Sequence, residues 1–188
     1  QKKNLELITE ELFLREVETF KNYLPVSLKN IMDIGCGLGI ININLNMIYK
    51  NEPHFFLLDK NKIDKKIKYG FSSNYESYND LNETRDILFK NNIKYSHIHI
   101  FDVDKKIEIN NKIDLVISLK SMGYHYPFEN YLNFLRACST SKTKFIFDVN
   151  SDYFDNKSFM NYFENIKVIY EEKTIHPLKR IYCEGIKF

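Results

Sequence analysis

The sequence predicts a three-layer α/β sandwich built on a mostly parallel, seven-stranded β-sheet. Short runs of β-branched and aromatic residues alternate with segments of helical periodicity along nearly the whole chain, as in successive βαβ units. The last two strands are joined too closely for a crossover, so one of them must run antiparallel. The 188 residues, 44% of them hydrophobic, are expected to form one domain, 1–188, with an N-terminal helical extension over about residues 1–25.

The elements of the first half follow from apolar spacing and from proline and glycine positions. Apolar residues at helical spacing predict a helix from about Asn4 to Tyr23, which Pro25 ends. Residues 60–76 are lysine-rich and then aromatic and polar, which predicts an irregular loop. The other predicted elements are strands at 31–34, 54–58 and 96–101, and helices at 40–49 and about 78–91.

The second half continues the alternation. Strands are predicted at 113–118 and 144–150, with a helix at 128–138 between them and a short helix near 154–163 after them. A turn around His176 and Pro177 then joins two closing strands, 167–170 and 180–184, as a β-hairpin.

Composition limits the class of partner. The 27 basic and 25 acidic residues nearly cancel and are scattered, so no basic stripe for nucleic acid is expected. No apolar run approaches the roughly 20 residues of a spanning helix, and no signal-peptide pattern is present, so no membrane partner is expected. Cys36, Cys138 and Cys183 are far apart and lack Cys-x-x-Cys spacing, which favours reduced thiols in the cytoplasm and no metal site.

The strongest motif lies where the first strand ends. Asp33 is followed by glycines at every second position, Gly35, Gly37 and Gly39. Glycine permits positive φ and removes Cβ atoms where backbone N–H groups approach a ligand, and a helix begins directly afterwards. A tight turn without a ligand is the weaker interpretation. Cys36 is expected to be a small filler rather than a nucleophile, because no basic partner lies nearby in sequence.

The ligand of this turn is not expected to be a dinucleotide. That fingerprint requires Gly-x-Gly-x-x-Gly, and the sixth position is Ile40 when counted from Gly35 and Asn42 when counted from Gly37. Asp59 ends the second strand, where the acid of a βαβ nucleotide-binding unit accepts hydrogen bonds from ribose hydroxyls. Asp102 follows the next strand in the same way. A solvated carboxylate is the alternative for both.

The pattern Asp-x-Gly-x-Gly-x-Gly, followed in order by Asp59 and Asp102, resembles class I methyltransferases that depend on S-adenosylmethionine (SAM). The resemblance covers residues 30–188. It implies a Rossmann-like sheet with an antiparallel C-terminal strand, SAM as cofactor and S-adenosylhomocysteine as product. By this resemblance Asp33 orients the SAM ammonium group, Asp59 binds the ribose and Asp102 the adenine. The residues implied to contact the cofactor are Asp33, Gly35, Cys36, Gly37, Gly39, Asp59, Lys60, Phe101, Asp102, Val103 and Ser118.

The segment after the fourth strand indicates the acceptor. Methyltransferases that act on amino groups of nucleic acids carry Asp/Asn-Pro-Pro-Tyr/Phe here, whereas this chain has Ser-Met-Gly-Tyr-His-Tyr-Pro over residues 121–127. Together with Tyr69-Gly70-Phe71, this arrangement looks like sugar O-methyltransferases of bacterial surface-glycan clusters.

His125 is predicted to be the general base for a hydroxyl acceptor. It is the histidine that follows the fourth strand, and an imidazole pKa of about 6.5 suits proton transfer near neutral pH. Tyr124 and Tyr126 are expected to shape the acceptor pocket, with Glu129 or Asp148 orienting the imidazole. A packed loop histidine is the alternative reading.

The predicted function is transfer of a methyl group from SAM to a small-molecule hydroxyl. Nucleic-acid methylation, and SAM binding without transferase activity, remain alternatives. The identity of the acceptor and the oligomeric state are left open.

Overall fold

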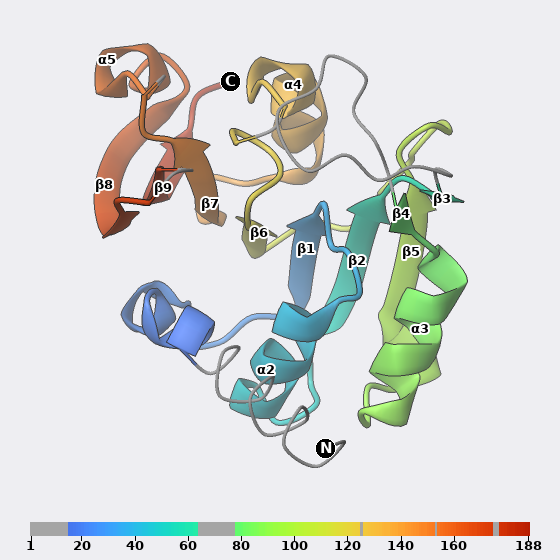
Figure 1. Cartoon of the computed structure of the whole chain (residues 1–188). Helices are drawn as coiled ribbons and strands as arrows, with labels where there is room; N and C mark the ends of the chain where they lie inside the picture. The colour runs from blue at the N-terminus through green and yellow to red at the C-terminus, as the bar shows by residue number, and fades with distance from the viewer. Residues whose placement is uncertain (1–14, 64–77, 125, 153, 175–176) are drawn as a thin grey trace.

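The sheet is the centre of the molecule. A computed structural model describes residues 15–63, 78–124, 126–152, 154–174 and 177–188 (Figure 1). The central sheet has seven strands in the order β5-β2-β1-β6-β7-β9-β8. In this sheet β9 runs antiparallel to both of its neighbours, and the other paired strands are parallel. This confirms the predicted fold class. The strands are β1 (Asn30–Ile34), β2 (His54–Asp59), β5 (Ile98–Asp102), β6 (Leu115–Ser118), β7 (Lys144–Asn150), β8 (Phe163–Glu172) and β9 (Leu178–Ile186).

Helices cover both faces of the sheet, which gives three layers (Figure 1). On one face Leu45 of α2 (Ile40–Ile48) and Leu88 of α3 (Leu81–Lys90) pack with Phe20, which lies between a helical turn at 15–18 and η1 (Lys21–Tyr23). On the other face Leu135 of α4 (Glu129–Cys138) and Phe159 of α5 (Asn156–Phe159) form the second core. The remaining helix is η2 (Tyr95–His97).

The parallel strands end together, and this creates the edge at which a ligand of such a sheet binds. Ile34 of β1 pairs with Leu58 of β2, and Asp59 at the end of β2 pairs with Asp102 at the end of β5. The glycine-rich turn and both strand-end acids therefore meet at this edge. In the described residues no helix has the length and apolar character required to cross a membrane.

Two predicted helix boundaries are wrong. The helix expected from Tyr78 begins at Leu81, because Asp80 is extended and its side chain accepts a 2.9 Å hydrogen bond from the N–H of Asn82. Residues Tyr78–Asn79 instead form β4, which pairs antiparallel with β3 (Lys62–Ile63). The helix expected at 154–163 is confined to α5, because Phe163 is fully buried and starts β8 by pairing with Ile186.

Some predicted features lie outside the described residues. These are the first part of the N-terminal helix, from Asn4 to residue 14, most of the loop at 60–76 with Tyr69-Gly70-Phe71, His125, and His176 in the closing turn. In the described remainder of the N-terminal segment, residues 15–18 are helical and η1 follows.

Candidate functional site

The turn after β1 is held against the end of β2. The N–H groups of Gly35 and Cys36 both donate to the carbonyl of Leu58, at 2.7 and 3.2 Å. Gly35 has φ +74°, and a Cβ placed on it would lie 2.0 Å from Oγ of Ser121. Gly37 has φ +50°, and no atom of the described residues lies within 4 Å of its Cβ position. Glycine is therefore required at 35 by close packing, whereas at 37 the described part of the chain leaves the Cβ position unoccupied.

Asp59 links this turn to its own strand end. Its Oδ2 accepts a 2.7 Å hydrogen bond from the N–H of Gly37, and Oδ1 accepts one of 2.7 Å from the N–H of Lys60. Burial raises the pKa of Asp59 above its usual value, and the bonds from Gly37, Lys60 and Asn79 act in the opposite direction. The carboxylate is thus fixed beside the backbone of the glycine turn.

Two neighbours of this turn were missed by sequence reasoning. The carbonyl of Gly37 accepts hydrogen bonds from Nδ2 of Asn79 at 3.1 Å and from Oγ1 of Thr84 at 2.8 Å. Both residues lie around the start of α3, more than 40 positions along the chain. Thr84 lies one turn into α3. A threonine inside a predicted helix was the sequence signal that could have indicated a side-chain hydrogen bond to another segment.

Asp33 is a buried carboxylate whose side-chain partner among the described residues is Asn42. Nδ2 of Asn42 donates to Asp33 Oδ2 at 2.6 Å, while Oδ1 of Asn42 is buried and has no hydrogen-bond partner among the described residues. Burial raises the pKa of Asp33 to about 7, the bond from Asn42 lowers it, and the charge of Asp59 raises it. A positive ligand group here would favour the ionised form of Asp33.

Asp102 lies next to Asp59 across the β2–β5 pairing. Burial acts to raise the pKa of Asp102, but the N–H of Asp104 and the ammonium of Lys105, 3.3 Å away, outweigh it and hold the pKa below its usual value. Phe101 and Val103 are partly buried against the core. The N–H of Val103 donates to the carbonyl of Asp59 at 3.0 Å, so this segment is fixed to the end of β2.

The loop after β6 lies over the glycine turn. Ser118, which ends β6, is fully buried; its hydroxyl donates to the carbonyl of Ile34 at 2.7 Å and accepts from the N–H of Met122 at 2.9 Å. Ser118 therefore anchors the loop to β1. The ring centre of Tyr126 is 5.8 Å from Nζ of Lys60 at the end of β2. The structure thus brings the predicted cofactor and acceptor segments together.

The predicted acceptor residues have partners of their own. Burial raises the pKa of the Tyr124 hydroxyl, and the charges of Asp148, Glu172 and Asp152 add to this. Glu129 accepts a 3.1 Å hydrogen bond from the hydroxyl of Tyr162. The proposed contacts of these residues with an acceptor, and their relation to His125, stay predictions.

Tyr131 of α4 was assigned to the core by its spacing, and it packs partly buried against the second core. Burial raises the pKa of its hydroxyl to about 12, and the charges of Tyr126 and Asp59 contribute in the same direction.

The chemistry of the cysteine in the turn is limited by its environment. Burial, followed by the charges of Asp33 and Asp59, raises the pKa of the Cys36 thiol well above its usual value, which agrees with a filler role. Within the described ranges no three His, Cys, Asp or Glu side chains are placed to hold one metal ion.

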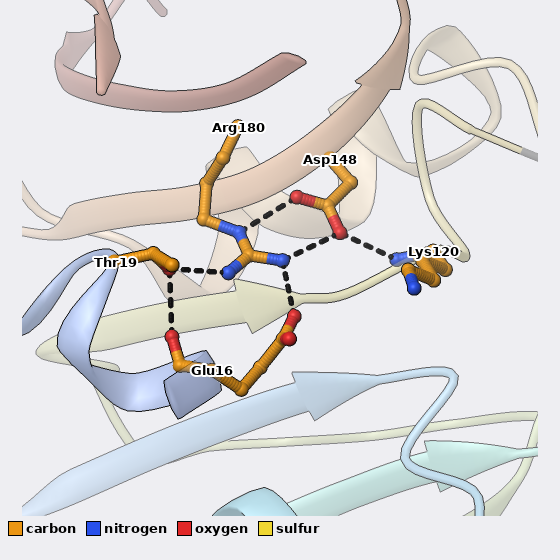
Figure 2. Close-up of polar contacts among 5 residues, drawn as sticks. All are labelled: Glu16, Thr19, Lys120, Asp148 and Arg180. Atoms are coloured by element: carbon orange, nitrogen blue, oxygen red, sulfur yellow. Dashed lines mark hydrogen bonds and ion pairs between the residues drawn. The ribbon is translucent and has the colours of Figure 1, made fainter. Parts of the chain in front are cut away.

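A buried ion-pair cluster is the feature that sequence reasoning missed most completely. Nε of Arg180 donates to Asp148 Oδ1 at 2.7 Å, and Nη2 donates both to Asp148 Oδ2 at 2.9 Å and to Glu16 Oε1 at 2.5 Å (Figure 2). Nη1 donates to Oγ1 of Thr19 at 2.6 Å. Arg180 is 1% exposed and Asp148 is fully buried. The residues lie up to 164 positions apart, so no local pattern signals the cluster.

Comparisons with known proteins identify the class of fold. No family model and no curated protein matches this sequence. Among solved structures, the ribosomal protein L11 methylase of Lactobacillus delbrueckii subsp. bulgaricus is similar, with a TM-score of 0.61 at 12% identity over 94% of this chain and 78% of that chain. The StiE O-MT structure has a TM-score of 0.59 at 14% identity, over 100% of this chain and 77% of that one.

A third similar structure acts on RNA. It is the 16S rRNA N2 G1207 methyltransferase of T. thermophilus, with a TM-score of 0.62 at 13% identity over 92% of this chain and 42% of that chain. These similarities and the strand order define the fold as that of class I SAM-dependent methyltransferases. At this level of identity they leave the acceptor undetermined.

Proposed function

We propose that this chain transfers a methyl group from SAM to a hydroxyl of a small molecule. The observation that carries the proposal is the glycine turn at 35–39, with buried Asp33 before it and Asp59 bonded to it, within a methyltransferase fold. A fit to SAM is supported by two features of the described residues: none of their atoms lies near the Cβ position of Gly37, and none bonds the buried Asn42 Oδ1 beside Asp33.

The residues that would hold SAM are those of the strand ends. Backbone groups of Gly35 and Gly37 would contact the methionine part, Asp33 its ammonium group, Asp59 the ribose and Asp102 the adenine. SAM, when bound, supplies a methyl group carried on a sulfonium. The neutral thioether that remains after transfer is a good leaving group. The chain then contributes mainly by aligning the acceptor, and His125 removes the proton of its hydroxyl. Tyr124 and Tyr126 position the acceptor.

A small acceptor is favoured over nucleic acid. The charges of the chain nearly cancel, and residues 121–127 lack the paired prolines of enzymes that methylate nucleic-acid amino groups. The similarity to an rRNA methyltransferase makes nucleic acid the competing acceptor class. A screen of sugars, phenols, DNA and RNA with labelled SAM decides between them. Label on a sugar supports the sugar O-methyltransferase reading, and no label on any acceptor despite SAM binding supports a binding protein.

Two further parts of the proposal concern organisation and compartment. Residues 1–188 are taken as one methyltransferase domain with an N-terminal helical extension. The free thiols of Cys36, Cys138 and Cys183 are all buried, which favours a reducing compartment such as the cytoplasm.

The first prediction is that SAM and S-adenosylhomocysteine bind in the presence of a metal chelator. Calorimetry is expected to give a saturable heat with both ligands and none with NAD. Asp59→Ala should weaken SAM by roughly 1.5–3 kcal/mol, because an ionised acceptor of ribose hydroxyls is lost. Asp104→Ala, a substitution of an exposed acid beyond the next strand, is the control. If neither SAM nor S-adenosylhomocysteine gives a binding heat, the proposed function is ruled out.

The second prediction is that SAM affinity rises with pH between 6 and 7.5. The pKa of Asp33 is about 7 without ligand, and a neighbouring ammonium lowers it, so binding releases a proton below this pH. Affinity at pH 7.5 should exceed that at pH 6 by about eightfold. Calorimetry in two buffers with different ionisation enthalpies measures the released proton. The Asp33→Asn variant should show neither effect, and an unchanged pH dependence in it would exclude Asp33 as the cause.

A further inference from the structure

The Arg180 side chain is buried, with aromatic rings near its guanidinium group and hydrogen-bond partners along its edges. Its guanidinium carbon lies 5.6 Å from the ring centre of Phe20 and 5.7 Å from that of Tyr170. Its edges bond Asp148, Glu16 and Thr19, as described above (Figure 2). A buried guanidinium needs such partners to offset the loss of hydration. Arg180 of β9 therefore joins the N-terminal segment at 15–20 to β7.

Asp148 carries this connection to the loop after β6. Its Oδ2 also accepts a 3.1 Å hydrogen bond from the backbone N–H of Lys120 (Figure 2). Lys120 has φ +56°, a conformation uncommon for a residue with a Cβ, so an external bond is needed to hold it. The next residue is Ser121, which lies directly over Gly35. The carboxylate of Asp148 thus holds the strained start of the loop after β6.

A second contact sets the same loop on β7. Gly123 has φ +83°, and a Cβ on it would lie 3.0 Å from the Phe147 ring and 3.1 Å from the carbonyl of Asp148. The backbone of the loop therefore rests directly on the residue that bonds Lys120. A change in the position of Asp148 moves two supports of the loop together.

We infer that Glu16 and Thr19 are positioning residues for the acceptor loop, by which we mean residues 119–124 after β6, acting through Arg180 and Asp148. The guanidinium is a rigid planar fork, so the bonds that Nη1 donates to Thr19 and Nη2 donates to Glu16 fix its plane. That plane determines where Nε and Nη2 meet Asp148, and hence where Asp148 meets Lys120. The inference rests on the proposed function, because the acceptor role of this loop is part of that proposal.

The glycine turn is supported differently. It bonds Leu58, Asp59, Asn79 and Thr84, none of which belongs to the Arg180 cluster. Loss of the Glu16 bond should therefore loosen the loop while SAM affinity changes by less than about twofold.

Amide hydrogen exchange of Lys120 tests the inference without any methyl acceptor. In Glu16→Ala the Lys120 amide should exchange about tenfold faster than in the wild type, because the bond that orients Arg180 is charge-assisted. Ile117 in the centre of β6 should exchange at the wild-type rate, which separates local loosening from global unfolding. Glu16→Gln keeps an acceptor oxygen and should restore most of the protection.

The matched control is Glu18→Ala. Glu18 lies on the same segment but is exposed and pairs with Lys21 at 2.5 Å, so its loss should leave Lys120 unchanged. Thr19→Val, which keeps the side-chain shape and removes the hydroxyl, provides a second test. Equal Lys120 exchange in Glu16→Ala, Thr19→Val and Glu18→Ala would overturn the inference. Calorimetry of the wild type with SAM tests the proposed function separately, so failure of one is distinguishable from failure of the other.

Discussion

Replacement of His125 by alanine is expected to lower kcat by about 10²–10⁴-fold and to leave SAM affinity nearly unchanged. A general base contributes on this scale when the acceptor is a hydroxyl. The rate of the wild type should rise with pH through the imidazole pKa, about 6.5 when unperturbed, and His125→Ala should lose that dependence. Turnover on an acceptor identified with labelled SAM, measured from pH 5.5 to 8, checks both expectations.

His54→Ala is the control for this experiment. His54 begins β2, and its Nδ1 lies 3.1 Å from Nε2 of His99 on the adjacent strand. It therefore sits at the opposite end of the parallel strands from the glycine turn, and its removal should leave kcat unchanged. If His125→Ala keeps full turnover, or loses only SAM binding, then His125 packs the site and alignment alone carries the reaction.

Arg180→Ala is expected to destabilise the protein by about 3–5 kcal/mol, because it leaves the buried carboxylate of Asp148 without its cation. Urea unfolding, followed by far-UV circular dichroism, measures this change. The deficit should grow as pH rises. Burial already raises the pKa of Asp148, and the bonds from Arg180 counteract it. Without them the pKa of folded Asp148 is raised further, so the variant loses stability with rising pH over a wider range than the wild type does.

The double variant Arg180→Met, Asp148→Leu provides the matched comparison. It removes both charges and fills the space with apolar groups, which often costs little or nothing. It should therefore be more stable than Arg180→Ala. If Arg180→Ala is as stable as the wild type at pH 8, then water reaches Asp148 and the ion pair is not closed off in the core.

The sequence alone determined the layout of the sheet and the place of the glycine turn. Each of the seven main strands overlaps a predicted strand, and the buried strands β1, β2, β6 and β7 were marked by continuous apolar runs, because burial on both faces requires them. The short β3–β4 pair was missed because two-residue strands leave no periodicity. The alternating glycines located the turn at 35–39, because positive φ and missing Cβ atoms are local requirements.

Only the tertiary structure decided which polar groups support that turn and the acceptor loop. Ser121 on Gly35, Thr84 on the carbonyl of Gly37, and Glu16 on Arg180 are pairings between distant segments. Local propensity carries no information about them, since each residue taken alone reads as an ordinary polar side chain. Glu129 or Asp148 was predicted to orient His125, which stays a prediction; the fold adds that the Asp148 carboxylate lies between Arg180 and the N–H of Lys120. The reason is packing: the antiparallel insertion of β9 sets Arg180 opposite Asp148, and burial compels the two charges to pair.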